Sequence, residues 1–317
     1  MARTRVYFVT DVHGSDRCFR KFINAAKFYN VGTLILGGDI TGKMIVPLVA
    51  QPDGTRVCEF GGGRRVAKSQ EELDRTVKAI KDSGYYPFLT DAKEADEISA
   101  APERQVPLFK TLMKESVAGW MKLAEERLKG TGVKCYISPG NDDYFEIDGV
   151  LDSSTFVVNP ELKVVDIDGE HEMITLGYTN HTPWNSPREV DEDVLEGMIE
   201  GMASKVRDPR RSLYNIHVPP IDTPIDQAPK LDKEMKPVMA AGAPVMISAG
   251  STAVRRMIEK HQPLLGIHGH IHESRGIVSI GRTLCANPGS EYGSGNLNGF
   301  LCELDGGQLN SYSLTQG

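Results

Sequence analysis

Several features that would narrow the function of this 317-residue sequence are missing. It has only five cysteines and no CxxC pair, which argues against a disulfide framework or a cysteine zinc site and favours a reducing compartment. No apolar run is long enough to span a bilayer, and the first residues lack the apolar stretch of a signal peptide. We therefore expect a cytoplasmic protein that does not bind a membrane.

An excess of positive charge is also missing. The 36 Lys and Arg residues are outnumbered by 43 Asp and Glu residues, so the formal net charge is −7. A field of this sign does not favour a polyanion such as duplex DNA, and the arginines at 64–65 and 207–211 are too few to form a basic stripe. Bound divalent cations can reverse the sign locally, so a small phosphorylated substrate remains compatible with the composition.

The order of strand and helix patterns indicates an α/β protein. Residues 5–10 read as a buried strand, 15–29 as an amphipathic helix and 33–36 as a second strand, which predicts a βαβ unit with parallel strands. Further strands are expected at 133–138, 213–216 and 264–267, each followed by polar residues. With 40% hydrophobic residues, the chain can bury a sizeable core.

Two segments interrupt this pattern. Residues 43–130 contain a hairpin turn at 52–55, a capped helix beginning after Ser69 and a long amphipathic helix at 106–129. We interpret 43–130 as a family-specific insertion in a single domain of residues 1–317, able to cover a site or to mediate a homo-oligomer contact. Residues 221–244 are rich in proline and polar residues and predict a long surface loop.

Side chains that can bind metal ions follow five of the expected strands. They are Asp11, His13, Asp39, Asn141, His217, His270 and His272. Open α/β sheets build their sites beyond the carboxyl ends of the strands, so these side chains can meet at one edge. Oxygen and imidazole ligands together suit two divalent ions of the Mn, Fe, Zn or Ni type.

Each fragment is weak when taken alone. Asn141 lies in an ordinary Pro-Gly-Asn turn sequence, His217 could be a buried structural histidine, and Asp142 and Asp143 could be solvated loop acids. The order of the fragments carries more information than any one of them. It runs D-x-H, G-D, G-N, a lone His after a strand, and G-H-x-H.

With this order the chain resembles the calcineurin-like metallophosphoesterase superfamily. The residues that carry the resemblance are Asp11-Val12-His13-Gly14, Gly38-Asp39, Gly140-Asn141-Asp142-Asp143, His217 and Gly269-His270-Ile271-His272. It implies a four-layer α/β/β/α sandwich of two mixed sheets with a dinuclear metal centre. It also implies that Asp11, His13 and His272 hold one ion, that Asn141, His217 and His270 hold the other, and that Asp39 bridges them.

The implied activity is a metal-dependent phosphoesterase, acting on phosphodiesters or phosphomonoesters through a metal-bridging hydroxide. Asp39, Asn141 and Asp142 form the expected catalytic set. Many relatives carry His where this chain has Asp142, and nearby cations would lower a carboxyl pKa, so we do not expect Asp142 to protonate the leaving group. The alternatives are a nuclease of the same superfamily, or a non-catalytic metal-binding scaffold for protein partners.

Overall fold

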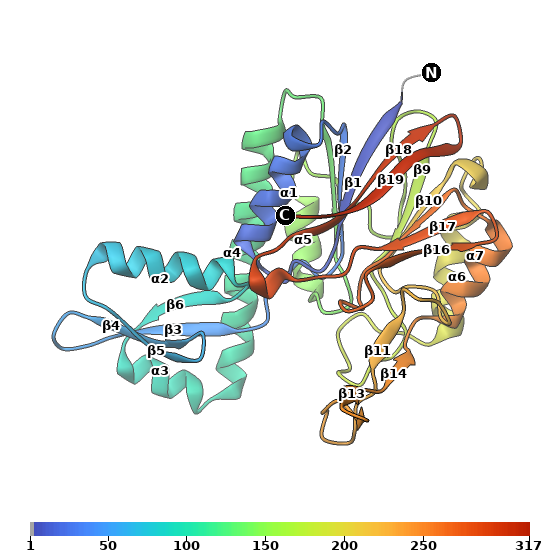
Figure 1. The fold of residues 1–317 in the computed structure, drawn as a ribbon. Helices are drawn as coiled ribbons and strands as arrows, with labels where there is room; N and C mark the ends of the chain where they lie inside the picture. The colour runs from blue at the N-terminus through green and yellow to red at the C-terminus, as the bar shows by residue number, and fades with distance from the viewer. Residues whose placement is uncertain (1–2) are drawn as a thin grey trace.

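The computed structural model describes residues 3–317, whose main body contains two mixed β-sheets (Figure 1). In the first sheet, β1 (Thr4–Val9), β2 (Thr33–Gly37) and β7 (Lys134–Ser138) are parallel neighbours. Strands β18 (Asn298–Asp305) and β19 (Gln308–Gln316) extend it in antiparallel fashion on the other side of β1. The three parallel strands therefore end at the same edge of this sheet.

The second sheet has six strands and a parallel centre. Its order along the sheet is β16 (Gly276–Ile280), β17 (Thr283–Asn287), β15 (Leu265–Ile267), β10 (Leu213–Ile216), β9 (Glu172–Leu176) and β8 (Val164–Asp166). The four strands from β17 to β9 are mutually parallel, whereas β16 and β8 are antiparallel to their neighbours. The antiparallel strands β8 and β9 are joined by a turn that contains Gly169, whose φ is 91°.

Long helices cover the outer faces of the two sheets (Figure 1). Helices α1 (Asp16–Phe28) and α4 (Pro102–Leu128) pack on the first sheet, and α6 (Glu192–Ala203) and α7 (Thr252–His261) pack on the second. The short helix α5 (Asp148–Asp152) lies near α4. Apolar side chains from both sheets, including Phe8, Ile267 and Phe300, form a separate buried cluster.

The βαβ unit at the start of the chain shows how local sequence determines these elements. Ser15 caps α1 by accepting a hydrogen bond from the Cys18 amide, and Phe19 and Phe22 on one face of the helix are fully buried. The Phe19 ring stacks on Trp120 of α4 with 4.2 Å between ring centroids. The parallel pairing of β1 and β2 predicted from sequence is confirmed.

A smaller unit follows β2 and has its own sheet and core. Its strands are β5 (Gly63–Ala67), β4 (Arg56–Phe60), β3 (Ile45–Ala50) and β6 (Tyr86–Thr90), in that order, and its helices are α2 (Gln70–Asp82) and α3 (Ala92–Ser99). Leu48, Cys58 and Ile80 belong to its buried cluster. Helix α4 lies within the segment interpreted as an insertion, but Met113 and Val117 pack into the main core beside α1.

The segment expected to be a long loop at 221–244 contains regular structure. Strand β11 (Gln227–Pro229) pairs with β14 (Met246–Ser248), and β12 (Met239–Ala240) pairs with β13 (Ala243–Pro244). Together they form an arm that projects from the main body (Figure 1). Single turns of 3-10 helix occur at Phe145–Ile147, Pro209–Arg211 and Tyr292–Ser294. Among residues 3–317, no helix combines the length and apolar character needed to cross a membrane.

Candidate metal centre

The structure brings all seven predicted metal ligands together at the carboxyl ends of the central strands. Asp11 and His13 follow β1, Asp39 follows β2, and Asn141 follows β7. His217 follows β10, and His270 and His272 follow β15. Since β1, β2 and β7 are adjacent in one sheet and β10 and β15 in the other, the site lies where the two sheets meet.

The backbone at this edge adopts conformations that are uncommon for residues other than glycine. Asp11, His13, Asp39 and His270 have φ values of 53°, 40°, 49° and 65°. Backbone hydrogen bonds hold the first two loops in register, because the Asp11 amide donates to Gly38 O at 3.0 Å and the His13 amide donates to Asp39 O at 2.9 Å. Such strain persists only where the surroundings impose it, and it concentrates at functional sites.

Glycines allow the motif loops to approach one another closely. Gly38 has a φ of +115°, and a Cβ there would lie 2.3 Å from His217 Nδ1. A Cβ at Gly140 would lie 2.3 Å from both the amide nitrogen and a carboxylate oxygen of Asp39. Both glycines are therefore needed for Asp39 to reach the same space as His217 and Asn141.

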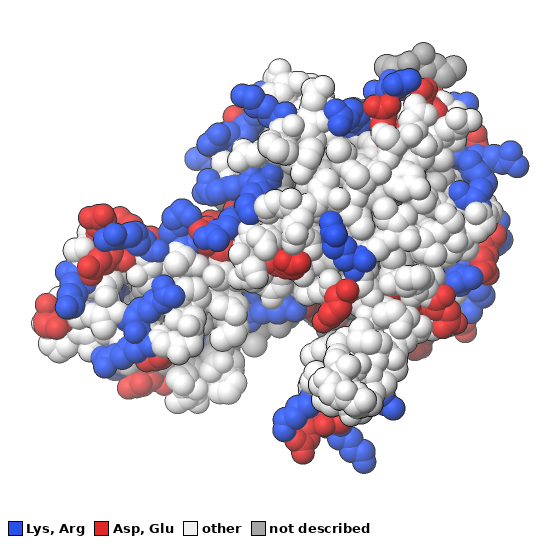
Figure 2. Space-filling model, in the orientation of Figure 1, with Lys and Arg blue, Asp and Glu red and all other residues white. Residues whose placement is uncertain are grey.

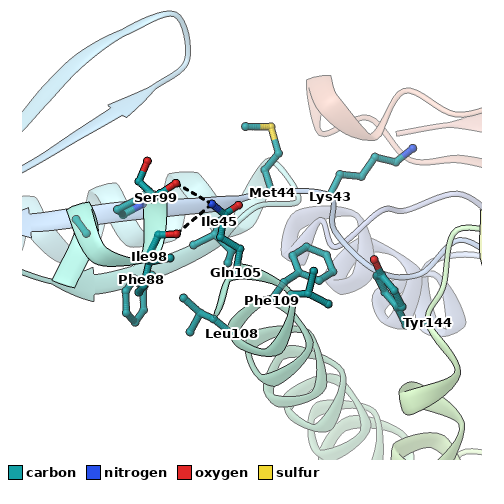
Figure 3. A pocket seen from close by; sticks show the side chains of 13 residues that line it. Lys43, Met44, Ile45, Phe88, Ile98, Ser99, Gln105, Leu108, Phe109 and Tyr144 are labelled. Atoms are coloured by element: carbon teal, nitrogen blue, oxygen red, sulfur yellow. Dashed lines mark hydrogen bonds between the residues drawn. The ribbon is translucent and has the colours of Figure 1, made fainter. Parts of the chain in front are cut away.

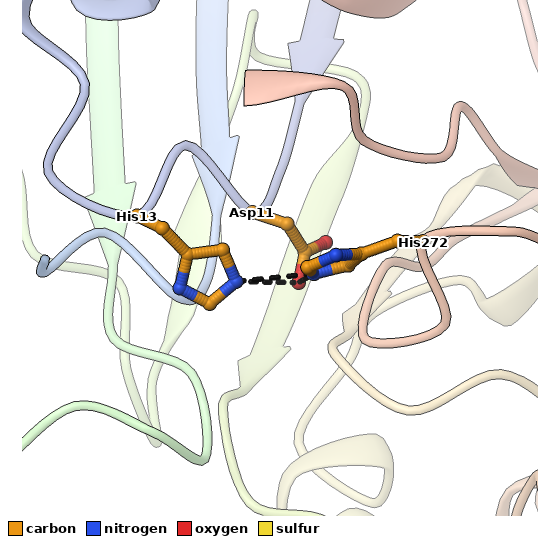
Figure 4. A group of neighbouring side chains, drawn as sticks. All are labelled: Asp11, His13 and His272. Carbon is orange, nitrogen blue, oxygen red and sulfur yellow. Dashed lines mark hydrogen bonds and ion pairs between the residues drawn. The ribbon is translucent and has the colours of Figure 1, made fainter. Parts of the chain in front are cut away.

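One group of ligand atoms is formed by Asp11, His13 and His272 (Figure 4). The Nε2 atoms of His13 and His272 are 3.0 Å apart, and Asp11 Oδ1 is 3.3 Å from His272 Nε2 and 3.9 Å from His13 Nε2. The three side chains converge on a common point from two different sheets. This is the set that the resemblance assigns to the first ion.

A second group joins Asp11, Asp39 and His217. His217 Nδ1 lies 3.0 Å from Gly37 O and serves as the donor, which leaves Nε2 free. His217 Nε2 is buried and makes no hydrogen bond. It lies 3.4 Å from Asp39 Oδ1 and 3.7 Å from Asp11 Oδ1. An imidazole oriented through one nitrogen with the other directed at two carboxylates has the arrangement of a metal ligand.

Asn141 and His270 lie against each other in the same site. Asn141 Oδ1 is 2.8 Å from His270 Nδ1, and Asn141 Nδ2 donates to Ser186 Oγ at 2.7 Å. The His270 amide donates to Asp11 Oδ2 at 3.0 Å. Ser186 thus directs the amide so that its oxygen, the atom able to bind a cation, faces the other ligands.

Electrostatics at the site favour a bound cation. Burial raises the pKa of Asp39 to about 7, although His217 opposes this change. Burial would also raise the pKa of Asp11, but the surrounding imidazoles, His217 first, bring it below its ordinary value. Burial would lower the pKa of His217, but the carboxylates of Asp39 and Asp11 raise it to about 10. The positive charge of protonated His217 thus offsets the negative charge of two buried carboxylates. A bound divalent ion can supply positive charge in place of this proton.

The remaining histidines differ in their environment. Burial lowers the pKa of His270 to about 4, so the ring is neutral and has a lone pair available for a ligand role. His268 has the same pKa direction, but its Nδ1 lies 2.8 Å from Ile216 O, at the end of β10. His171 is buried beside Asp168, and His261 contacts Glu200 at the end of α7, so the carboxylate partner of each lies outside the predicted ligand set.

Asp143 connects two loops that carry predicted ligands, a role that the sequence did not indicate. The expectation that it could be a solvated loop acid is wrong, because the side chain is fully buried and accepts hydrogen bonds from the amides of Ile40, Thr41 and Gly140 at 2.8–3.0 Å. It also accepts from the Thr41 hydroxyl. Asp143 therefore fastens the loop that carries Asp39 to the loop that carries Asn141.

Arg188 contacts the loop that carries Asn141 and Asp143, and the sequence did not predict this role. It is almost fully buried, and its Nε donates to Asp143 O at 2.9 Å while Nη2 donates to Asp148 Oδ1 at 2.6 Å. Its own amide donates to Asn141 O at 3.2 Å. Nothing in the local sequence distinguishes this arginine from a surface residue.

Lys43 lies at the rim of the site, where the smaller unit begins. Its Nζ is 2.7 Å from Asp142 Oδ2, and the Asp142 amide donates to Asp39 Oδ1 at 3.0 Å. Asp142 also shares a group of possible ligand atoms with His13 and Asp39. The structure thus places Asp142 beside the predicted ligands, with a cation next to it that the motif order did not reveal.

Comparisons with other proteins agree with this architecture. No protein-family model matches the chain. An uncharacterized protein of Methanocaldococcus jannaschii is 32% identical over 152 residues, which make up 47% of this chain and 61% of the archaeal protein. The structure of TT1561 of Thermus thermophilus has a TM-score of 0.53 at 12% identity, covering 100% of this chain and 99% of its own. Another solved chain has a TM-score of 0.57 at 15% identity and 99% coverage of both.

At these identities the solved structures establish a shared fold. The two mixed sheets, with motif side chains at the carboxyl ends of their parallel strands, are the arrangement implied by the sequence resemblance. The chain shares this fold with the two solved structures, and its sequence motifs resemble those of the calcineurin-like metallophosphoesterase superfamily.

Proposed function

We propose that this chain is a metal-dependent phosphoesterase whose metal centre holds two divalent ions within the four-layer sandwich of that superfamily. The observation that carries the proposal is the convergence of ligand atoms from both sheets on one site. His13 and His272 direct Nε2 atoms at each other across 3.0 Å, and His217 Nε2 is buried without a partner beside two carboxylates. The donor set of carboxylate, imidazole and amide oxygen fits ions such as Mn, Fe, Zn or Ni.

The residues would divide between the ions as the motif order implies. Asp11, His13 and His272 would hold one, Asn141, His217 and His270 the other, and Asp39 would contribute to both. When bound, the ions supply Lewis-acid chemistry, which lowers the pKa of water and neutralises charge on a phosphoester. Asp143 and Arg188 keep the ligand loops in place for this task.

Lys43 has a separate part in the proposed reaction. Burial lowers its pKa and the ion pair with Asp142 raises it, with a net increase, so the ammonium stays charged and is a poor proton donor at neutral pH. Its positive charge at the rim would stabilise negative charge on a bound phosphate. Asp142 would position Lys43 rather than protonate the leaving group. The leaving group would then depart with a proton from water.

Neither alternative has a specific observation in its favour. On the face drawn in Figure 2, basic and acidic side chains are interspersed over the smaller unit and at the tip of the arm, whereas basic side chains gather over α1 and α4. The net charge of −7 does not favour binding to nucleic acid. A non-catalytic scaffold would not need all seven ligand side chains in one place. We therefore propose a small phosphorylated molecule as the substrate.

The test compares chelated protein with the same protein reloaded with Mn, Fe, Zn or Ni. Hydrolysis of aryl phosphodiesters and phosphomonoesters is measured together with metal content by elemental analysis. We expect about two ions per chain and activity that returns with them. Full activity in protein without bound metal would refute the proposal.

A further inference from the structure

A cavity of about 440 Å³ lies beside the metal centre, between the smaller unit and the first turns of α4 (Figure 3). Its wall is mainly apolar and includes Ile45 and Pro47 from β3, Phe88 from β6, Ile98 from α3, and Leu108 and Phe109 from α4. The volume falls within the roughly 300–1,000 Å³ typical of small-molecule sites. The cavity is thus large enough for part of a substrate.

A second hollow of about 240 Å³ connects this cavity with the metal centre. It shares Lys43, Phe109 and Tyr144 with the larger cavity, and its wall also contains Thr41 and Asp142. Lys43 Nζ contacts Asp142 at 2.7 Å, and the Asp142 amide bonds to Asp39 at 3.0 Å. A continuous path therefore runs from the apolar wall, past one positive charge, to the predicted ligands.

Polar side chains are few on the wall of the larger cavity: besides Lys43 they are Ser99, Gln105 and Tyr144. Lys43 is its one charged residue, at the end nearest the metal centre. The Gln105 amide already donates to the carbonyls of Ile98 and Ser99, at 3.1 and 3.3 Å (Figure 3). Large apolar side chains on its wall, Met44 and Val106, are 54% and 47% exposed, as expected where a ligand rather than protein covers them.

We propose that this cavity binds an uncharged apolar group of the substrate while the phosphate, guided by Lys43, reaches the metal centre. The inference rests on the phosphoesterase function proposed above and narrows it to phosphoesters of apolar alcohols. Sugars and nucleosides are disfavoured, because their many hydroxyls and ring nitrogens would lose water and gain few partners in this mainly apolar wall. The smaller unit then determines substrate choice, while the two-sheet body carries the chemistry.

Binding without turnover tests the cavity directly. Calorimetry on Mn-loaded protein would measure the affinity of n-alkylphosphonates from methyl to octyl, with phenylphosphonate as an aromatic probe. Affinity should rise roughly threefold to fourfold per methylene until the cavity is full. Ala95→Trp fills the cavity, and Ala92→Trp adds the same group to an exposed position of α3 that is not part of the wall.

We expect the rise with chain length in the wild type and in Ala92→Trp, and equal affinity for all chain lengths in Ala95→Trp. Methylphosphonate should bind all three proteins equally, which also shows that Ala95→Trp is folded. Affinity independent of chain length in the wild type, or an undiminished rise in Ala95→Trp, would overturn the inference.

Hydrolysis of the matching p-nitrophenyl alkylphosphonates separates this inference from the proposed function. Length-dependent binding without any hydrolysis would refute the phosphoesterase and retain the apolar site. Hydrolysis with kcat/KM and affinity both independent of chain length would retain the phosphoesterase and refute the apolar site. Failure of every phosphonate to bind would refute both.

Discussion

The Nε2 atoms of His13 and His272 lie 3.0 Å apart although 259 positions separate the two residues in the chain. Without an ion, one ring can donate a single N–H···N hydrogen bond to the other, and which ring donates depends on the tautomers. Asp11 Oδ1, at 3.3 Å from His272 Nε2, adds a negative charge to the same point. A cation shared by the three side chains satisfies all of them, and the predictions that follow depend on that conclusion.

Removing the Asp39 carboxylate should lower the metal content of the protein. Asp39→Asn deletes the negative charge of the side chain that is proposed to contribute to both ions. Changes to residues that only support ligands typically lower metal affinity about 10- to 100-fold, and we expect a larger loss here. Elemental analysis after dialysis against Mn measures the loss. Asp96→Asn, an exposed substitution on α3, is the matched control, and unchanged metal content in Asp39→Asn would contradict the assignment.

Metal should also stabilise the folded chain, because the converging ligands exist only in the native state. At a free Mn concentration about 100 times its Kd, a single site adds about 2.7 kcal/mol to the free energy of unfolding. Urea denaturation with and without chelator gives the difference. An unfolding midpoint that does not change with Mn would show that the group does not bind this ion.

Asp143 should affect the metal without being a ligand. Asp143→Asn directs an NH2 group at backbone amides that now donate to a carboxylate, and each unsatisfied group costs about 1–3 kcal/mol. We expect lower stability together with metal affinity reduced by about 10- to 100-fold. Asp152→Asn, an exposed acid at the end of α5, controls for the charge change. Normal metal affinity in Asp143→Asn would show that the hydrogen bonds of Asp143 do not determine the positions of the metal ligands.

Lys43→Met should lower the rate while leaving metal content intact. Loss of a preorganised positive charge near the phosphate costs roughly 100-fold in kcat, and Lys43→Arg should recover part of it. With no strong acid at this position, aryl esters should be hydrolysed faster than alkyl esters by the wild type. A wild-type rate independent of leaving-group pKa would show that another residue donates the proton. Lys93→Met, exposed on α3, serves as the control.

Glu161 should make stability depend on pH. Burial raises its pKa from 4.5 to about 8, even though the Gly177 amide donates to the carboxylate at 2.9 Å. The folded state therefore keeps a proton that the unfolded state releases, so the contribution of Glu161 is fully present below pH 4.5 and is lost as pH rises toward 8.

The slope from this one group is at most about 1.4 kcal/mol per pH unit. Glu161→Gln should remove it, so the free energy of unfolding of the variant relative to the wild type should increase between pH 5 and pH 8. Urea denaturation across this range gives the comparison. Parallel pH profiles for the two proteins would show that Glu161 is ionised in the folded state.

Much of the fold could be predicted because its information is local. The apolar run before Asp11, the capping Ser15 and the buried face of α1 each occupy a few adjacent positions, and their pairing as a βαβ unit follows from short connections. The Ser69 cap is equally local, since its side chain accepts from the Glu72 amide three residues later. The seven ligand side chains could be named because each follows a recognisable strand and because their order along the chain resembles that of a known superfamily.

The tertiary structure decided what each polar residue contacts. Asp142 and Asp143 are neighbours in sequence, yet Asp143 is sealed beneath the Asp39 loop and Asp142 pairs with Lys43 from the smaller unit. The amphipathic pattern of α4 predicted a helix but not its place in the main core against Phe19. Periodicity reports which face of an element is apolar, whereas burial, pKa and ligand geometry arise from groups that are distant in sequence and meet only when the chain has folded.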